Sequence, residues 1–455
     1  MSDRKARLGP GYWKLWTASV VSNLGDGLSL IAYPWLASAL TRNPVAIAGV
    51  AVATRLPWLV FTLPAGVITD RVDRRKLVLG MDIGRFGLTL GVAIAVLAGE
   101  SGLNDPGDIA DGLASTPDNA AFALVMLYLA ALLLGSAEVL RDNSAQTLMP
   151  SLVDAEQLER ANGRMWGAEM VTNAFIGPPL AGFLLSVSFA LPFFVDAGTF
   201  AVAAGLLFLI AGDFAPKGKP ADAPPTSFRD DLREGVRWLW RHQLIKSLAI
   251  ALGALNGLFA LQHANDVLFA QEILDLSAAG FGALSIAAAI GGVLGSVVAH
   301  RVSDRLGPGN SLFATIIVSA IAPALIGALP SVPLVFSMFI VSSFFAVVWN
   351  VITVALRQTL IPDHLLGRVN SVYRFFGWGM IPIGSLVGGV LVVVVDSFAS
   401  RDTALRVPFG VSAVAHILLL AYALPRLNTS EIDAAKEAHA AAAQESADVE
   451  VDEPG

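Results

Sequence analysis

The chain has 455 residues, of which 55% are hydrophobic and only 15% are charged, and it contains no cysteine. Soluble domains are typically about 45–50% apolar and about 25% charged, so this composition excludes a soluble globular enzyme and a disordered chain. The lack of cysteine also excludes disulfide frameworks, zinc ribbons and thiol nucleophiles. The formal net charge of −7 is uninformative, because the placement of Lys and Arg decides the orientation of a membrane protein.

Twelve long apolar runs predict an all-α polytopic membrane protein. Each run has about 20 residues or more, which is enough to cross a hydrocarbon core about 30 Å thick. The expected spans are 14–40, 46–69, 77–98, 121–141, 164–187, 189–212, 246–271, 277–300, 311–330, 333–357, 368–395 and 405–426. No cleavage site follows the basic start of the chain, so we expect an uncleaved signal-anchor helix.

Basic residues gather on alternate connections between the expected spans. One side holds only Arg42, Arg401 and Arg406, together with the segment 99–120, which is acidic and has no basic residue. Basic loops usually stay in the cytoplasm, so we expect the other side and both chain ends to be cytoplasmic. We expect the protein to lie in the inner membrane of the cell. That side holds Arg71, Arg74, Arg75, Lys76, Arg160, Arg164, Lys217, Lys219, Arg229, Arg233, Arg237, Arg241, Arg301 and Arg305.

Composition divides the chain into four parts. A polar, Pro-rich stretch begins after the sixth span, and an acidic, Ala-rich tail follows the twelfth, which we expect to be disordered apart from a short helix at 431–444. The expected parts are an N-terminal six-helix half (1–212), a cytoplasmic linker with an amphipathic helix (213–243), a C-terminal six-helix half (244–427) and the acidic cytoplasmic tail (428–455).

The amphipathic helix of the linker carries a basic stripe. Apolar residues recur at helical spacing between Phe228 and His242, and an arginine occupies every fourth position from Arg229 to Arg241. Such a helix is suited to an anionic membrane surface. The alternative is a solvated helix that only tethers the two halves.

An internal repeat relates the two halves. The sequence Gln-Thr-Leu-Met-Pro at 146–150 returns as Gln-Thr-Leu-Ile-Pro at 358–362, and each copy is followed by Arg-x-Asn. Asp26-Gly27-Leu28 is matched more weakly by Asn256-Gly257-Leu258. Two parallel six-helix halves, related by pseudo-symmetry, explain these matches and are typical of transporters that move about a central cavity.

The connection between the second and third spans carries the residues of a family signature. Gly66, Asp70, Arg71, Arg74 and Arg75 resemble the G-x-x-x-D-R-x-G-R-R/K motif of the major facilitator superfamily. Asp73 replaces the second glycine, so the tight turn of the motif is an open question. Together with the repeat segments, the motif resembles the twelve-span exporter branch that includes macrolide and multidrug efflux proteins and the enterobactin exporter.

The resemblance implies the major facilitator fold and a proton-driven antiporter that alternates between inward-open and outward-open states. It implies that the signature loop controls gating, with Asp70 as its acidic residue and Arg71 and Arg74 as basic neighbours. Gly177, Pro178 and Gly182 resemble the fifth-span antiporter motif. The alternative for these three residues is close helix packing with a proline kink, whatever the direction of transport.

Charged residues inside the expected spans are candidates for function, because each costs about 2.5–3.5 kcal/mol on insertion scales. Asp26 lies near the middle of the first span between two glycines, and we expect it to couple protons or contact substrate, or else to make a structural hydrogen bond. Arg55 is its expected partner, unless it extends to the membrane surface. Glu169 and Asp196 are further candidates for coupling or substrate contact.

Two other polar groups have separate expected roles. Asp82 and Arg85 share one face of the third span, and with Glu138 and Arg141 we expect them to form a cytoplasmic charge network that braces the signature loop. His263 and Asp266 form a possible second protonation site. The expected substrate cavity is lined by polar and aromatic side chains, which could instead serve packing: Asn23, Asn173, Asn256, Asn350, Tyr373 and Trp378.

The sequence predicts a proton-coupled secondary transporter that exports an amphipathic drug, siderophore or metabolite. It contains no nucleotide-binding loop and no catalytic motif, so we expect no enzyme activity, no cofactor and no metal site. We expect protons, membrane lipids and a small molecule as partners, no nucleic acid, and a monomer. The alternatives are a lipid or lysophospholipid transporter, a nutrient importer of the same fold and, more remotely, a non-transporting sensor or scaffold.

Overall fold

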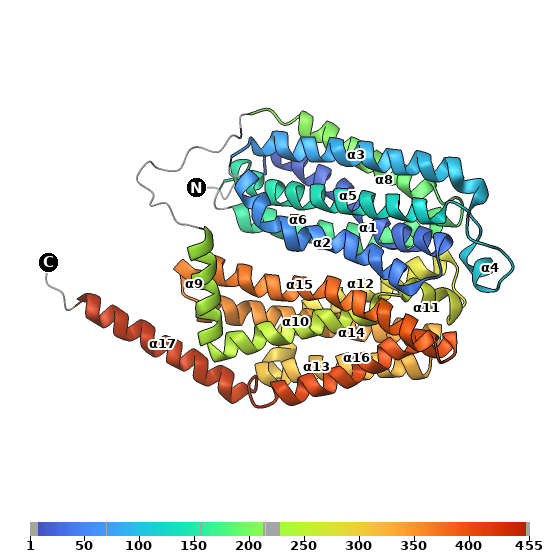
Figure 1. Ribbon diagram of the computed structural model, residues 1–455. Helices are drawn as coiled ribbons and strands as arrows, with labels where there is room; N and C mark the ends of the chain where they lie inside the picture. Colours follow the sequence, from blue (N-terminus) through green and yellow to red (C-terminus); the bar gives the residue numbers. More distant parts are fainter. Residues whose placement is uncertain (1–7, 70, 155–156, 213, 215–227, 452–455) are drawn as a thin grey trace. The chain divides into compact units, whose positions relative to one another are not determined.

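The computed structural model describes residues 8–69, 71–154, 157–212, 214 and 228–451, and within these ranges all regular secondary structure is helical (Figure 1). A helix or a series of helical segments covers each of the twelve expected spans. Their bounds are α1 (Pro10–Leu40), α2 (Pro44–Thr69), α3 (Arg74–Gly99), α5 (Ala120–Leu148), α6 (Leu158–Met170), η4 (Val171–Ile176), α7 (Gly177–Leu185), α8 (Leu191–Phe208), α10 (Gln243–His263), α11 (Asp266–Glu272), α12 (Ala278–Leu306), α13 (Pro308–Ala328), α14 (Val332–Leu360), α15 (Asp363–Asp396) and α16 (Arg401–Ala423).

Ten of these segments are long and apolar enough to cross a membrane on length and composition. The two expected spans outside this group are the first and the fifth. The first, α1, contains serines together with Asn23 and Asp26, which lower its mean hydropathy. The fifth is divided into α6, η4 and α7, so no single helix in it has the length required.

The division of the fifth span has a local cause. Residues Val171–Ile176 form a π-helical turn directly before Gly177 and Pro178. Proline has no N–H to donate to the carbonyl four residues earlier, and its ring crowds that carbonyl, so the regular ladder cannot continue through it. π-turns of this kind absorb one extra residue within an otherwise continuous helix. The kink expected at the proline is therefore a π-segment on its N-terminal side.

By its internal contacts the chain forms two units. Unit 1 contains Met1–Asp222, His263–Ala289 and Ser385–Leu405, and unit 2 contains Ala223–Gln262, Ile290–Gly384 and Arg406–Gly455. Unit 1 thus includes α11 and parts of α12, α15 and α16, and the division into two six-helix halves stays a prediction. In unit 1, α1 packs against α8 and α7, α3 packs against α8 and α5, and α2 packs against α5. In unit 2, α13 packs against α14.

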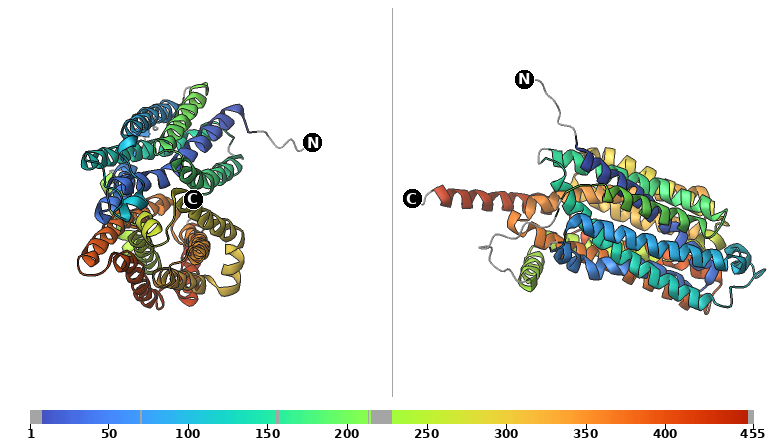
Figure 2. Two further views of the ribbon diagram at one scale, coloured as in Figure 1. Left: turned by 90° about the vertical axis from the view of Figure 1, so that its right-hand side faces the viewer. Right: turned by 90° about the horizontal axis from the view of Figure 1, so that it is seen from above.

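The helix expected at 431–444 is present and is longer than predicted, so the prediction of disorder was wrong for 429–430 and 445–451. Helix α17 runs from Thr429 to Val451, and Figure 2 shows it extending away from α16. The side chain of Asn428 accepts a hydrogen bond from the backbone N–H of Glu431 (2.9 Å), and Ile432 is fully buried in the core of unit 2. A side-chain cap, an Ala-rich sequence and one buried anchor together explain why the helix forms.

The expected amphipathic helix is present as α9 (Phe228–Arg241). Its apolar face contributes Leu239, which is buried in the core of unit 2. Glu234 pairs with Arg368, whose backbone lies directly against Gly235. Helix α9 is thus packed on unit 2 and leaves Arg233, Arg237 and Arg241 exposed. Most of the predicted linker before it, 215–227, lies outside the described residues.

Candidate functional site

The Gly-Asp-Gly sequence of α1 lies where this helix crosses two others. A Cβ atom on Gly25 would overlap the carboxylate of Asp196 in α8. A Cβ atom on Gly27 would lie 2.6 Å from the carbonyl oxygen of Asn173 in the π-segment and 3.0 Å from the Cα of Gly177. Only glycine permits both approaches, so the two glycines hold Asp26 at the crossing of α1 with α8 and the fifth span.

Asp26 pairs with Arg85 of α3, so the prediction that Arg55 is its partner was wrong. The guanidinium of Arg85 also donates to the hydroxyl of Ser22 (3.1 Å) and lies 3.9 Å from the centre of the Phe200 ring. Arg85 is only 2% exposed. Arg55, on α2, instead lies within electrostatic reach of Glu138 on α5, against which α2 packs.

A chain of ion pairs continues from Arg85 into α5. The carboxylate of Asp82, which is fully buried, lies 3.9 Å from Arg85 and 3.5 Å from Arg141. Arg141 in turn lies 3.2 Å from Asp142 and donates to the hydroxyl of Ser19 on α1 (3.2 Å). The expected network of Asp82, Arg85, Glu138 and Arg141 is therefore present, and ion pairing also joins it to Asp26. Its role as a brace for the signature loop stays a prediction.

Two further carboxylates complete this site. Asp196 is 2% exposed; one of its oxygens accepts from the hydroxyl of Ser29 (3.1 Å), and the other has no hydrogen-bond partner among the described residues. Glu138 lies within electrostatic reach of both Asp26 and Arg85. We call this set the buried charge cluster, although three members (Asp26, Glu138 and Asp142) keep some exposure. Its members are Asp26, Asp82, Arg85, Glu138, Arg141, Asp142 and Asp196. Glu169, before the π-segment, is half-buried and within electrostatic reach of it.

A second network lies in unit 1 near α4 (Pro106–Ala110). Arg42, between α1 and α2, pairs with Glu272 and donates to Gln271 (2.6 Å). Arg401, at the start of α16, contacts Glu272 (2.9 Å) and Asp396 (3.1 Å). We call Arg42, Glu272, Asp396 and Arg401 the α4-end network. Sequence reasoning missed it, although the scarcity of basic residues in this set of connections made Arg42 and Arg401 conspicuous.

The remaining coupling candidates, His263 and Asp266, contact each other. The Nδ1 atom of His263, at the end of α10, lies 2.6 Å from the carboxylate of Asp266, at the start of α11. The proximity predicted from their spacing is confirmed. Both side chains are partly exposed, at 17% and 26%.

The residues expected to line a cavity have mixed environments. Asn23 and Tyr373 are buried: Asn23 donates to Ser19 of its own helix (2.9 Å) and Tyr373 donates to the carbonyl of Leu248 (3.5 Å), so neither lines an open space here. Asn256 donates to the carbonyl of Gly377 (2.9 Å). The others keep some exposure: Asn173 is half-buried, and Asn350 and Trp378 are exposed.

The signature loop is ordered by Asp73 rather than by a glycine. Asp73 has φ −55°, which any residue adopts, and its carboxylate caps α3 by accepting from the backbone N–H of Lys76 (2.9 Å). It also accepts from the backbone N–H of Phe214 (3.3 Å). Burial alone would raise the pKa of Asp73, but these two hydrogen bonds and the nearby Lys76 and Arg75 bring its pKa below the ordinary value.

The other signature residues surround this cap. Arg74 donates to the carbonyl of Thr147 (3.4 Å) and Arg75 donates to that of Ile210, while Arg71 is exposed. Gly66 lies within the last turn of α2, and Asp70 lies outside the described residues. The loop is therefore tied to α5 and to the end of α8.

The residues of the fifth-span motif are packing residues in this structure. Gly177 and Pro178 are buried, and Gly177 lies against Gly27 as described above. Gly182 lies against the backbone of Ala278, where a side chain would overlap the carbonyl oxygen. The packing prediction for this motif is confirmed, and its relation to the direction of transport stays a prediction.

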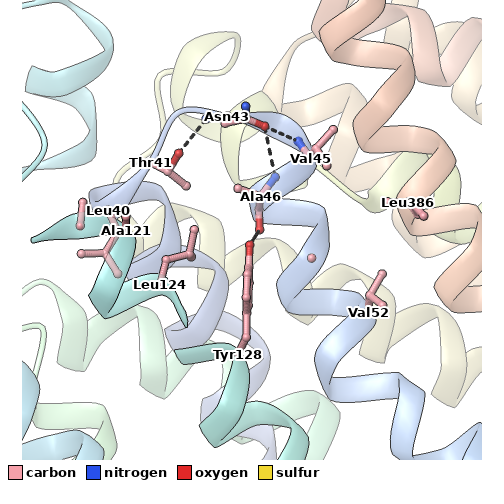
Figure 3. Close-up of a pocket in the computed structure, with 12 residues that line it drawn as sticks. Leu40, Thr41, Asn43, Val45, Ala46, Val52, Ala121, Leu124, Tyr128 and Leu386 are labelled. Carbon is pink, nitrogen blue, oxygen red and sulfur yellow. Dashed lines mark hydrogen bonds between the residues drawn. The ribbon is translucent and has the colours of Figure 1, made fainter. Parts of the chain in front are cut away.

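An apolar pocket of about 620 Å³ opens beside the first connection of unit 1 (Figure 3). Tyr128 of α5 points across it and donates to the carbonyl of Ala46, while Asn43 accepts from the backbone N–H groups of Val45 (2.9 Å) and Ala46 (3.2 Å). Its other lining residues are mostly aliphatic: Leu40, Thr41, Gly49, Val52, Ala120, Ala121, Leu124 and Leu386.

Residues 15–377 and 264–447 match the family model of the Major Facilitator Superfamily. The chain belongs to this superfamily. It is therefore a multi-pass membrane protein of a family of transporters rather than of enzymes, in agreement with its apolar helices.

Two curated relatives of this superfamily member align over most of its length. It is 26% identical over 446 residues to the multidrug efflux pump Tap of Mycobacterium tuberculosis, with 96% of this chain and 97% of that protein covered. It is 24% identical over 418 residues to the enterobactin exporter EntS of Shigella boydii, with 90% and 91% covered.

Solved structures show the same fold. A bacterial homologue of the iron transporter ferroportin in an inward-facing state superposes with a TM-score of 0.67 at 17% identity, covering 92% of this chain and 99% of that one. A mutant form of the nucleoside transporter NupG superposes with a TM-score of 0.66 at 14% identity, covering 92% and 100%. At these identities the likeness concerns the fold alone.

Proposed function

We propose that this chain is a proton-coupled exporter of an amphipathic small molecule that works by alternating access. The observation that carries the proposal is the composition of the buried charge cluster, which has five carboxylates but only two guanidinium groups. With Arg55 counted as well, the carboxylates still outnumber the cations by two. Burying uncompensated negative charge inside a bundle is costly, so we expect the cluster to hold protons.

Asp26 is the member best placed to convert proton binding into movement. It sits on α1 where that helix crosses α8 and the fifth span, and its carboxylate is paired with Arg85 of α3. Protonation would neutralise Asp26 and weaken its attraction to Arg85, which changes the balance of forces on a tightly packed crossing. A packed interface responds to such a change by switching between discrete arrangements rather than by deforming gradually.

The α4-end network supports alternation at a second position. Its four charged side chains connect the α1–α2 connection, α11 and the ends of α15 and α16, and they are between 12% and 34% exposed. If this end of the bundle opens during transport, these ion pairs separate and become hydrated. The network would then favour the state in which this end is closed.

The direction and substrate class are proposed from the named activities of the two curated relatives, a multidrug efflux pump and an enterobactin exporter. The distribution of basic residues supports an inner-membrane location with both termini in the cytoplasm. We further propose that the protein acts as a monomer, with protons and membrane lipids as its other partners.

Transport of a lipid or lysophospholipid is the second candidate. The apolar pocket in Figure 3 favours it, because mostly aliphatic walls suit a hydrocarbon chain. Proteoliposomes would separate the two: lysophospholipid should be moved and ethidium ignored if the second candidate is correct, with the opposite pattern for the first.

The direct test is ethidium efflux from proteoliposomes driven by an imposed pH gradient. Asp26→Asn mimics a permanently protonated Asp26 and should reduce the stimulation by the gradient about tenfold or more, a size typical of coupling between two sites. Ethidium binding should persist. The matched control is Asp108→Asn in α4, which makes the same chemical change on an exposed helix. Gradient-driven efflux at the wild-type rate in the Asp26 variant would remove Asp26 from the coupling mechanism.

A further inference from the structure

Unit 2 contains a hollow that the transport proposal does not use. It has a volume of about 670 Å³ and lies among the α9–α10 junction, the ends of α14 and α16, and α17. A neighbouring hollow of about 400 Å³ shares Trp238, Arg241 and His242 with it and adds Arg237. The residues that matter below are Trp238, Arg241, His242, Arg426, Glu431 and His439.

The walls of this hollow are fixed to the core of unit 2. On one side Leu239 of α9 is 1% exposed, and on the other Ile432 of α17 is fully buried. The hydroxyl of Thr429 accepts from the backbone N–H of Gly309 (3.2 Å), which ties the start of α17 to α13. Because both helices are anchored, the space between them is preformed rather than a gap between mobile segments.

The charges around the hollow are unbalanced toward positive. Arg426 donates to the carbonyl of Tyr422 (2.9 Å) and lies 4.4 Å from the centre of its ring, and within the described part of the chain no carboxylate pairs with it. Among the residues that the structure describes, no carboxylate pairs with Arg241 either. Glu431 is the only acidic residue lining the larger hollow, while Glu234 beside the smaller one is already paired with Arg368.

His242 adds a directed donor. Its Nδ1 atom accepts from the backbone N–H of Ile245 (3.4 Å), which places the proton of the neutral ring on Nε2. The ring stacks on Trp238, with centroids 5.0 Å apart. Burial and the nearby His439 lower the pKa of His242, against the opposing effect of its backbone hydrogen bond. In the neutral ring the Nε2–H is left as a donor, beside the two arginines that also line the hollow.

Apart from Gln243, the remaining walls are apolar. Leu360, Pro362 and Pro425 mark the points at which α14 and α16 end, so the hollow lies where these spans leave the membrane. Ala434, Ala435 and Ala438 of α17 form a smooth opposite wall. Basic pockets at this level between membrane helices suit the headgroups of anionic lipids.

We propose that this hollow binds the phosphate group of an anionic phospholipid, with Arg241 and Arg426 facing the phosphate and Trp238 and the alanines of α17 beside the glycerol and the first part of the acyl chain. Lipid occupancy would join α9 to α17 across the hollow. The proposal is independent of the transported molecule and of proton coupling.

The test uses the full-length protein in nanodiscs of phosphatidylcholine with a small fraction of phosphatidylglycerol, with bound lipid counted by native mass spectrometry. Arg241→Gln and Arg426→Gln should each reduce phosphatidylglycerol retention about fivefold, the effect expected of one basic residue at an anionic surface. The matched control is Arg233→Gln, which removes the same charge from an exposed position of α9 that does not line the hollow. Equal retention by the Arg233 and Arg241 variants would overturn the proposal.

A soluble competitor distinguishes the two possible sources of phosphate. Glycerol 3-phosphate should displace little phosphatidylglycerol, because it lacks the acyl chain that the apolar walls contact. If it binds as well as the lipid does, the ligand is a free phosphate ester and the lipid assignment is wrong. Lipid retention is measured without transport, so its loss or persistence is separable from the outcome for Asp26→Asn.

Discussion

The interiors of the two units differ although the sequence repeat relates their helices. Every aspartate and arginine that is buried among the described residues belongs to unit 1. At the position of unit 2 that corresponds to Asp26 stands Asn256, which donates to the carbonyl of Gly377, and the surrounding core is aliphatic and aromatic, with Trp349 and Tyr373. The helices of the two units are thus alike, whereas buried aspartates and arginines occur in unit 1 only, among the described residues.

This difference indicates that the fold does not require the buried aspartates and arginines of unit 1. Each buried charge inside a span costs free energy, and unit 2 shows that comparable helices pack without a buried aspartate or arginine among the described residues. A cost carried by unit 1 alone supports the proposal that protons bind there. Three predictions probe the contrast, in order of decreasing expected effect.

The largest effect is expected for Arg85→Gln. Arg85 is one of only two guanidinium groups within the buried charge cluster, and removing it leaves Asp26 and Asp82 with less compensation. Removing one partner of a buried pair typically costs about 3–5 kcal/mol. We expect a loss of this size in the free energy of unfolding, measured by denaturant titration of the purified protein.

The double variant provides the control for this prediction. Adding Asp26→Asn to Arg85→Gln removes the uncompensated carboxylate as well and should restore part of the lost stability. Asp26→Asn alone should have a smaller effect, because Arg85 keeps the carboxylate of Asp82 as a partner. If the double variant is no more stable than Arg85→Gln, the cation is needed for packing rather than for charge balance.

A smaller effect is expected when a charge is introduced into unit 2. Asn256→Asp replaces the amide that donates to Gly377 with a carboxylate that cannot donate when ionised. We expect a loss of about 2.5–3.5 kcal/mol, the usual cost of a charge within a span. The control is Asn310→Asp, near the start of α13, where a carboxylate is favoured by the helix dipole. An Asn256 variant as stable as this control would show that unit 2 tolerates buried charge after all.

The smallest effects concern the loops before α3 and α13. The loop in unit 1 uses the Asp73 cap, whereas that in unit 2 uses Gly307 with φ +81° and no side-chain cap. Asp73→Ala should cost about 1 kcal/mol, and Asp73→Asn much less, because Asn also caps helices. Gly307→Ala should cost about 1–2 kcal/mol through backbone strain. Melting temperatures of the three variants test this, and equal values for Asp73→Ala and Asp73→Asn would exclude capping as the role of Asp73.

Much of the fold was predictable because long apolar runs leave few alternatives. Each expected span corresponds to helical structure, and α9 follows from its apolar spacing. The tail was less predictable: Ile432 is one apolar residue in a polar sequence, and its anchoring depends on a core assembled from distant helices. The turn at Asp73 was uncertain for a similar reason, since its second hydrogen bond comes from Phe214, far along the chain.

The candidate site was predictable in its members but not in its connections. Charge inside apolar runs identified Asp26, Asp82, Arg85 and Arg141, yet their pairing depends on which helices are neighbours. Chain order suggested α2 as the neighbour of α1, whereas the glycines bring α1 against α8 and the fifth span, and Arg85 reaches Asp26 from α3. Glu272 was missed because nothing in its surroundings distinguishes it from an ordinary surface residue until it meets Arg42 and Arg401.

The π-segment at Val171–Ile176 sets the angular phase of the fifth span. One residue of α-helix corresponds to a rotation of about 100°, so the extra residue offsets the faces of α6 and α7 by that amount. Deleting a single residue there would rotate Glu169 by about 100° away from its present direction while Gly177 stays against Gly27. The faces of α6 and α7 therefore point in directions that one continuous α-helix would not give them.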